Sequence, residues 1–296
     1  DLFSNSDDSR EALVPGKPGY VGGALMHLAN LWHTWSTLTD AVRAGTSVVE
    51  RDDRAMAEFA GPFIAAMHVI AGRQAARIVS QIDLTNVRRV LDAGGGSGAY
   101  SMEFCRAKAD IEAVVFDLPG VVPLTREYVE RAGMTGRVST VTGNFNTDPL
   151  PGGFDLTFLS QVLHSNDPEE NRALMKKCSG ALNPGGQIVI QEFVVDENRT
   201  SPMPHVLFAL NMLVGTRAGD TYTESEIKSW LEAAGFTDVR RVDPPETEKR
   251  KGSPRSPPAT SRVSGPWAEA LAEAKAGRAS DATRGSIERI RSLGGG

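Results

Sequence analysis

The sequence lacks any uninterrupted apolar run of 18 residues, so no segment is expected to cross a membrane as a helix. It has only two cysteines, Cys105 and Cys178, without the short spacing of a metal site, and reduced structural thiols in a cytoplasmic protein are expected. No charged stretch followed by an apolar one opens the given sequence, which begins at Asp1 and not at Met. The net charge of −5 argues against a general nucleic-acid-binding protein. These deficits predict a cytoplasmic protein with neither a metal, a nucleic acid nor a membrane as partner.

The last fifty residues differ from the rest in charge and composition. From Thr247 onward the chain has ten Lys and Arg against five Asp and Glu, which leaves −10 for the residues before it. This stretch is rich in Pro, Ser, Gly, Ala and Arg and has little apolar periodicity. We therefore predict that residues 247–296 form a basic, disordered tail.

Residues 1–86 have the apolar periodicity of helices. Large apolar side chains recur at intervals of three and four residues, as expected for helices that bury one face. The simplest interpretation of such stripes is core packing. One stripe comprises Leu25, Leu28, Leu31, Trp32, Trp35 and Leu38, and a second comprises Phe59, Phe63, Met67 and Ile70.

From Val87 the pattern changes to alternating strands and helices. Strands are predicted at residues 88–93, 112–117, 137–142, 154–160 and 186–192, with helices at 98–108, 123–133 and 168–182. A further helix at 225–236 and a strand at 237–242 close the pattern. Nearly continuous apolar strands suit a parallel sheet covered on both faces. Residues 87–246 are therefore predicted to form an α/β domain with a doubly wound sheet.

The stretch "VLDAGGGSGAY", residues 90–100, predicts a ligand site at the end of the first strand. It satisfies the dinucleotide pattern G-x-G-x-x-G/A, with Asp117 near the distance of a ribose-binding acid. It also satisfies the looser D-x-G-x-G-x-G pattern of S-adenosylmethionine sites. A carboxylate at Asp92 would repel a pyrophosphate but attract a sulfonium or ammonium group, which favours the second ligand.

Later motifs carry a family resemblance. They are "VFDLPGVV" (115–122), "VTGNF" (141–145) and the run "FDLTFLSQVLHSND" (154–167), together with the turn "LNPGG" (182–186). In this order and spacing, the chain resembles the class I S-adenosylmethionine-dependent O-methyltransferases of the caffeate, hydroxyindole and microbial polyketide type over residues 12–246. The resemblance implies a Rossmann-like methyltransferase sheet preceded by a helical segment. It also implies methyl transfer to a hydroxyl of a small aromatic or polyketide-like acceptor in secondary metabolism.

The resemblance further implies which residues hold the cofactor. The glycines after the first strand leave the backbone bare, so that the cofactor can approach closely. Asp117 and Leu118 hold its ribose and flank its adenine. Asn144 and Phe145 bracket the adenine. Asn144 stands where the family usually has Asp, and Ser160 where some plant members have Lys. The cofactor-binding residues so implied are Asp92, Gly94, Gly96, Gly98, Asp117, Leu118, Asn144, Phe145 and Ser160.

His164, in "VLHSND", occupies the position of the family's catalytic histidine, which removes the proton of the acceptor hydroxyl. Glu192, in "IVIQEF", matches a glutamate that orients that histidine. Two departures concern the substrate side. Thr221, next to Asp220, stands where plant members have a second glutamate, and Ser165-Asn166 replaces their Asp-Trp pair.

The resemblance also places Phe63, Met67 and Met212 at positions that wall the acceptor pocket in relatives, although core residues would look the same. Relatives carry an N-terminal winged-helix domain that forms most of their dimer interface. This chain matches from near the end of that domain, so residues 1–86 are expected to supply the end of the dimerisation region and the substrate-pocket helices. A homodimer is therefore left open.

The other end departs from the family. Relatives supply a final antiparallel strand beside the fifth, whereas "EKRKGSPRSPP" has prolines, a glycine and four basic residues that a central strand does not tolerate. The sheet is therefore expected to lack that strand, and the edge of the fifth strand to stay open.

Three other functions compete with O-methylation. The same fold and cofactor could serve C-methylation or hydroxylation, although the retained His164 favours oxygen as the acceptor. A degraded, non-catalytic ligand-binding chain is the second, and an NAD-dependent dehydrogenase, disfavoured by Asp92, is the third.

Overall fold

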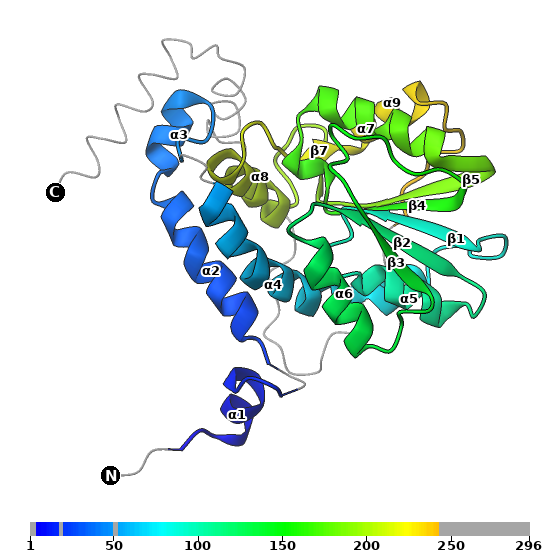
Figure 1. Ribbon diagram of the computed structural model, residues 1–296. Coiled ribbons are helices and arrows are strands. Elements are labelled where there is room, and N and C mark those ends of the chain that lie inside the picture. Colours follow the sequence, from blue (N-terminus) through cyan, green and yellow to red (C-terminus); the bar gives the residue numbers. More distant parts are fainter. Residues whose placement is uncertain (1–3, 18–19, 50–52, 243–296) are drawn as a thin grey trace, which may run out of the picture.

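The computed structural model describes residues 4–17, 20–49 and 53–242. The predicted tail at 247–296 lies outside these ranges. Figure 1 shows two parts side by side, a group of helices from the beginning of the chain and a sheet with helices above and below it. This arrangement confirms the predicted α/β fold with a helical segment before it.

The sheet has five parallel strands in the order β3-β2-β1-β4-β5. Buried apolar side chains on both faces explain why these segments read as continuous apolar runs. The chain order reverses between β1 and β4, and in such sheets ligands bind at the carboxyl ends of the strands beside that point. The strands are β1 Arg89–Ala93, β2 Glu112–Asp117, β3 Val138–Thr142, β4 Phe154–Ser160 and β5 Leu182–Gln191.

Helices cover both faces of the sheet. On one face, α5 (Ala99–Ala107) and α6 (Val122–Arg131) pack on the sheet, and α4 (Asp53–Val79) lies against α5. On the other face, α7 (Pro168–Ala181) and α9 (Glu224–Ala233) pack on β4, β5 and each other. Both α7 and α9 begin at a capping box, in which the first residue's side chain and a glutamate three positions later satisfy each other's backbone N–H groups. These local signals explain why the helices were predictable.

The helices before the sheet are α1 (Asp7–Leu13), α2 (Gly22–Trp35), α3 (Leu38–Ala44) and α4, and α8 (Met203–Gly215) joins them from the other end of the chain. Helix α2 contacts α4 and α8, and α3 contacts α8. Although α4 is 27 residues long, no helix in the described ranges is both long and apolar enough to cross a bilayer.

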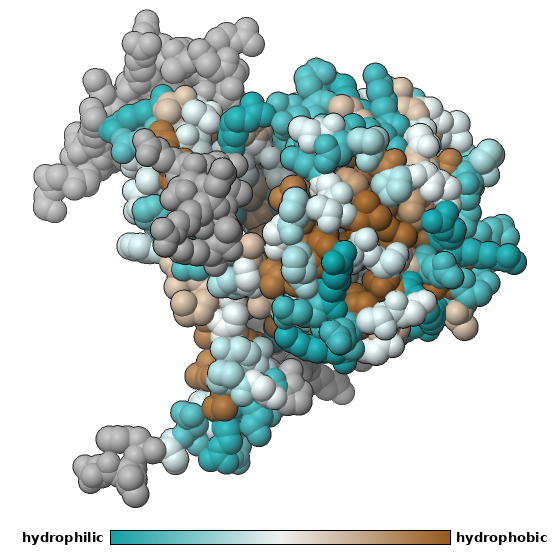
Figure 2. All heavy atoms as spheres, viewed as in Figure 1, coloured by the Kyte–Doolittle hydropathy of each residue, from teal (hydrophilic) through white to brown (hydrophobic). Residues whose placement is uncertain are grey.

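Core packing was the wrong interpretation for much of the α2 stripe. Leu25, Leu28 and Trp32 are 49%, 62% and 77% exposed. Figure 2 shows apolar side chains along this helix at the lower left of the molecule. These three side chains share one face. Helix α2 contacts α4 and α8 elsewhere, and at its C-terminal end the Trp35 indole donates a hydrogen bond to Asn211 Oδ1 at 2.9 Å. The stripe is therefore apolar on a side that no described element covers.

The end of the sheet also differs from the prediction. Residues 237–242 form no regular strand, since no strand in the described ranges lies beside them to supply ladder hydrogen bonds. Strand β5 begins at Leu182, because "LNPGG" forms an irregular first stretch of the strand instead of a separate turn. Among the described residues, the edge of β5 away from β4 has no partner strand, and residues 248–258, on which the expectation of an open edge rests, lie outside the described ranges.

Candidate functional site

The glycine-rich loop at residues 94–98 joins β1 to α5 at the switch point of the sheet. Gly94 has a φ of +75°, and a Cβ there would lie 2.9 Å from Val162 Cγ2 and 3.3 Å from the Phe145 ring. Only glycine adopts this conformation without strain and leaves the backbone bare at this point. The loop therefore presents main-chain atoms, and not side chains, to the crevice at the end of β1.

Asp117, the last residue of β2, fixes the loop from the neighbouring strand. Its Oδ2 accepts a hydrogen bond from the Gly96 N–H at 2.8 Å, and its Oδ1 accepts one from the Leu118 N–H at 2.7 Å. Burial raises the pKa of this carboxyl, and the two hydrogen bonds oppose that rise. Leu118 follows with its side chain 44% exposed at the rim of the crevice. Asp117, which the resemblance assigns to the ribose together with Leu118, is thus bonded directly to the glycine loop.

Asp92 lies beneath the loop and is almost fully buried. Its Oδ2 accepts a hydrogen bond from Ser101 Oγ at 2.7 Å, whereas its Oδ1 is buried without a hydrogen-bond partner. Burial, together with the nearby Asp117, raises the pKa of Asp92 to about 7. An unpaired buried carboxylate oxygen is costly, so a positively charged ligand group next to it would be favoured.

The loop between β3 and β4 carries Asn144 and Phe145. Asn144 Oδ1 accepts a hydrogen bond from the Asn146 N–H at 2.9 Å, and the Phe145 ring lies against Gly94. Lys177 of α7 holds the loop from behind, since its Nζ donates to the carbonyl oxygens of Phe145, Asn146 and Asp148 at 2.7, 2.9 and 2.9 Å. No sequence pattern indicated a role for this lysine, because its three acceptors are main-chain atoms about thirty residues away.

Ser160, at the end of β4, makes internal contacts. Its hydroxyl donates to Gln191 Oε1 at 2.6 Å, and the same oxygen accepts the Tyr100 hydroxyl at 2.8 Å. This pair of bonds connects β4, β5 and α5 beside the glycine loop.

His164 and Glu192 meet at the ends of the adjacent strands β4 and β5. His164 lies in a short 3-10 turn (Leu163–Ser165), and its Nδ1 is 2.8 Å from Glu192 Oε1. Glu192 Oε1 also accepts the Phe193 N–H at 2.8 Å. The side chain of Glu192 is 1% exposed and that of His164 is 12% exposed. Because an ionised carboxylate can only accept, Nδ1 carries the proton of this bond and Nε2 keeps its lone pair.

Two aromatic rings enclose the imidazole and were not predicted from the sequence. The Phe208 ring of α8 meets the His164 ring edge-to-face, with centroids 4.9 Å apart, and Phe193 lies against Phe208 at 4.3 Å. Met212, 7% exposed, lies one turn further along α8. An apolar wall therefore stands on the α8 side of the histidine.

Helix α4 contributes the other predicted wall residues, Phe63 and Met67, both half-buried. The same helix contacts the glycine loop, since Ile64 Cδ1 would lie 3.6 Å from a Cβ on Gly96. His68 Nδ1 lies 2.8 Å from the Ser97 Oγ, a contact that the sequence did not indicate. Helix α4 therefore lies directly against the glycine loop.

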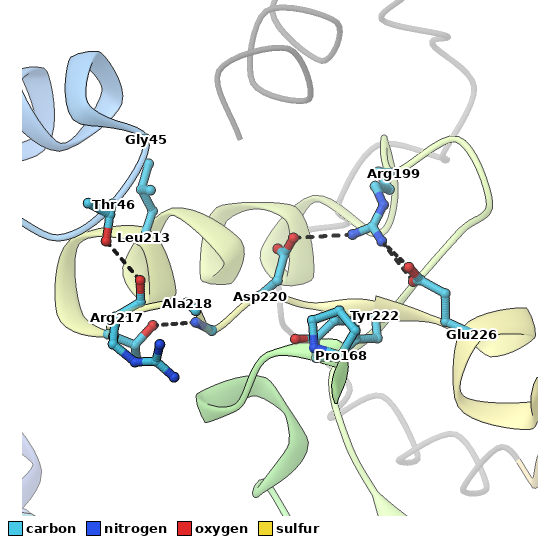
Figure 3. A pocket seen from close by; sticks show the side chains of 12 residues that line it. Gly45, Thr46, Pro168, Arg199, Leu213, Arg217, Ala218, Asp220, Tyr222 and Glu226 are labelled. Atoms are coloured by element: carbon cyan, nitrogen blue, oxygen red, sulfur yellow. Dashed lines mark hydrogen bonds and ion pairs between the residues drawn. The ribbon is translucent and has the colours of Figure 1, made fainter. Parts of the chain in front are cut away.

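Asp220 lines a separate charged cavity of about 260 Å³, and the next residue, Thr221, is buried, with its carbonyl oxygen accepting a hydrogen bond from Arg199 at 2.7 Å. Figure 3 shows Arg199 between Asp220 and Glu226, and it bonds both Glu226 oxygens at 2.7 Å. The backbone of Gly219 packs on the back of the histidine turn, where an added Cβ would clash with the His164 carbonyl oxygen. Arg199 is therefore paired with two carboxylates in this cavity, and the Gly219 backbone beside it packs against the turn that carries His164.

In the described part of the chain, no group of three or more His, Cys, Asp or Glu side chains could hold a metal ion. The geometry instead offers a bare glycine loop, a buried acid with an unpaired oxygen, and a histidine oriented by a buried glutamate.

Comparison with known proteins agrees with this arrangement. Residues 35–237 match the family described as the O-methyltransferase domain. The chain is 38% identical to 3-hydroxy-5-methyl-1-naphthoate 3-O-methyltransferase of Streptomyces sahachiroi, over 81% of this chain and 71% of the relative. It is 33% identical to the tetracenomycin polyketide synthesis 8-O-methyl transferase of Streptomyces glaucescens, over 83% and 75%. The crystal structure of human N-acetylserotonin methyltransferase in complex with SAM is similar, with a TM-score of 0.70 and 27% identity over 80% of this chain and 70% of that one.

Proposed function

Because this chain belongs to the O-methyltransferase family, we propose that it transfers a methyl group from S-adenosylmethionine to a hydroxyl of a small aromatic or polyketide-like molecule. The relatives named for naphthoate and tetracenomycin methylation support an aromatic acceptor and a place in secondary metabolism.

The residues at the switch point suit this cofactor. The glycine loop is bare where a Cβ at Gly94 would meet Val162 and Phe145, and Asp92 Oδ1 is a buried oxygen that lacks a partner. When bound, S-adenosylmethionine supplies a methyl group on a positively charged sulfur. Gly94, Gly96 and Gly98 would leave room for it, and Asp92 would offset its positive charge. Asp117 and Leu118 would hold the ribose of the cofactor, and Asn144 and Phe145 would bracket its adenine. Ser160 would contact the cofactor at the end of β4.

The His164–Glu192 pair carries the proposal. Glu192 Oε1 accepts a hydrogen bond from His164 Nδ1, with the two atoms 2.8 Å apart, and this bond favours the tautomer whose Nε2 can take a proton. When the methyl group passes from the cofactor's sulfur to the acceptor oxygen, its carbon–sulfur bond would break with the electron pair left on sulfur, and His164 Nε2 would take the proton that the hydroxyl loses. The buried carboxylate of Glu192 then stabilises the imidazolium that forms. Phe193 and Phe208 exclude water from one side of the ring and provide an apolar surface for an aromatic acceptor.

The acceptor side is proposed to include Phe63 and Met67 of α4 and Met212 of α8. In this proposal the chain consists of a helical segment at 1–86, a cofactor-binding domain at 87–246 and a tail at 247–296. A cytoplasmic location is supported by the buried, unpaired thiols of Cys105 and Cys178. A homodimer is supported by the exposed apolar face of α2.

Calorimetric titration with S-adenosylhomocysteine, with NAD as the control, tests the cofactor. Binding of the first ligand alone is the expected result, and binding of NAD alone would contradict the proposal. A screen of phenols with S-adenosylmethionine then tests the chemistry, with His164→Ala as the inactive partner. Cofactor binding without methylation of any hydroxyl, but with methylation of carbon, would favour the C-methylation alternative.

A further inference from the structure

Two segments of the site come from different loops yet lie close together. The cofactor loop, residues 143–148, carries Asn144 and Phe145 after β3. The histidine turn, residues 162–166, carries His164 after β4. The sequence separates their polar side chains by about twenty residues, and no main-chain hydrogen bond among those described joins the two segments.

Three asparagine side chains connect these segments, and each donates a hydrogen bond to the next group in the chain. Asn146 Nδ2 donates to Asn166 Oδ1 at 3.0 Å, and Asn166 Nδ2 donates to Asn171 Oδ1 at 3.2 Å. Asn171 Nδ2 then donates to the carbonyl oxygen of Leu163 at 3.0 Å. Leu163 directly precedes His164, so the chain of amides begins on the cofactor loop and ends on the backbone of the histidine turn.

Asn166 is the central member and has every polar group paired. Besides its two side-chain bonds, its N–H donates to the Leu163 carbonyl oxygen at 3.2 Å, and its carbonyl oxygen accepts the Tyr222 hydroxyl. Asn166 is 2% exposed and Asn171 is fully buried. Buried amides in which each nitrogen and oxygen has a partner favour one arrangement, because the flipped amide would place a donor against a donor.

We propose that Asn146, Asn166 and Asn171 form a relay of positioning residues that holds His164 in a fixed relation to the nucleotide end of the cofactor. This inference rests on the proposed function, since it assigns the cofactor loop to the nucleotide and His164 to the proton transfer.

Asn146→Ala tests the relay from its exposed end. Asn146 lies on the surface, so the substitution breaks the first link without leaving a large cavity. The measurements are the imidazole NMR signals of His164 in the ligand-free protein, assigned by their loss in His164→Gln, and the affinity for S-adenosylhomocysteine. We expect the His164 signals to move and the affinity to fall roughly two- to tenfold, the range for loss of one ordinary hydrogen bond.

Asn183→Ala is the matched control. Asn183 is also an exposed asparagine that donates one side-chain hydrogen bond, to Asp155 Oδ1 at 2.8 Å, but it lies at the opposite end of the sheet. Neither the His164 signals nor the affinity should change in this variant. Weaker binding by Asn146→Ala with unmoved His164 signals would overturn the relay, because Asn146 would then serve its own loop alone.

A double-mutant cycle with Asn166→Leu provides the second test. If the three amides act as a unit, the effects of Asn146→Ala and Asn166→Leu on affinity will be less than additive. Additive effects would overturn the proposal. Failure of the unaltered protein to bind S-adenosylhomocysteine would contradict the proposed function, whereas the His164 signals of the ligand-free variants would still decide the relay.

Discussion

His164 has one ring nitrogen committed to Glu192 and the other left to act as a base. We predict that His164→Gln lowers the methylation rate by about 10²- to 10⁴-fold, the usual contribution of a positioned general base. Its affinity for S-adenosylhomocysteine should change little, because the glycine loop, Asp92 and Asp117 are untouched. Steady-state kinetics with the phenol found in the screen, together with calorimetry, separate these two effects.

The control for this substitution is His33→Gln. His33 is an exposed histidine of α2, and its replacement should leave both rate and affinity unchanged. Equal rates for His164→Gln and the unaltered enzyme would remove the histidine from the mechanism and leave positioning of the acceptor as the source of the rate.

Asp92 should make cofactor binding depend on pH. Because burial and the nearby Asp117 raise its pKa to about 7, the ligand-free protein keeps the Asp92 proton at mildly acidic pH. A cationic ligand binds best to the ionised carboxylate, so the affinity for S-adenosylmethionine should rise by up to about tenfold per pH unit below 7 and level off above it. Calorimetry in two buffers of different ionisation enthalpy should detect release of the proton, and Asp92→Asn should abolish both the release and this pH dependence.

The raised pKa of Asp92 should also make the stability of the protein depend on pH. The direction follows from the pKa of this carboxyl in the folded and unfolded states. The unfolded carboxyl loses its proton near its ordinary pKa of 3.8, whereas the folded one keeps it until about pH 7. Between these values the folded state binds more protons, so this contribution to stability is present in full below 3.8 and is lost as the pH rises towards 7. Ligand-free Asp92→Asn should therefore resist urea better than the unaltered protein at pH 8, and an equal or lower midpoint would contradict this account.

At the scale of elements, Lys177 of α7 binds three carbonyl oxygens of the loop after β3. We predict that Lys177→Met lowers the free energy of unfolding by about 1–3 kcal/mol, because three carbonyl oxygens lose a charged donor. The affinity for S-adenosylhomocysteine should fall as well, since Phe145 would no longer be held against Gly94. Urea unfolding and calorimetry measure the two effects.

The neighbouring residue supplies the control. Lys176 has the same side chain on the same helix but is exposed, so Lys176→Met removes the same charge without touching the loop. Equal losses in both variants would assign the effect to net charge and not to the anchored loop.

The elements that could be predicted are those whose signals are local. Strands β1 to β4, the positive-φ glycines after β1 and the capping boxes of α7 and α9 each depend on residues within a few positions of one another. The strand expected at 237–242 failed because a strand needs a partner, and an apolar pattern does not say whether a neighbour exists. The short strands β6 (Val194–Val195) and β7 (Tyr222–Thr223) pair across nearly thirty residues, and their two-residue length leaves no periodicity to detect.

The site divides in the same way. The sequence places Asp92, Asp117 and Glu192 at or directly after the carboxyl end of a strand, and His164 in the 3-10 turn four residues after β4. The carboxyl ends of parallel strands meet at one edge of the sheet, so their proximity could be expected. The Asn146–Asn166–Asn171 relay and the Lys177 anchor were not predictable, because they join side chains or main-chain atoms from separate loops and helices. Their partners become neighbours only after the whole molecule has folded.

At the scale of the whole molecule, the α2 stripe shows the limit of periodicity. It correctly identified a helix with apolar residues at three- and four-residue intervals. It did not distinguish the face that packs on α4 and α8 from the face that carries Leu25, Leu28 and Trp32 into solvent. An apolar pattern specifies that a surface favours burial, but not whether the same chain or another copy buries it.

The exposed face of α2 therefore leads to the last prediction, a homodimer in solution. Trp32, at 77% exposure, is the most exposed of these large apolar side chains, and a charge there should oppose association. We expect the protein to sediment as a dimer and Trp32→Glu to sediment as a monomer. Val141→Glu, an exposed apolar residue on the edge strand β3, is the control and should remain dimeric. A monomer for the unaltered protein at every concentration tested would mean that α2 does not join two copies. Dissociation in Val141→Glu as well would assign the contact to a different surface.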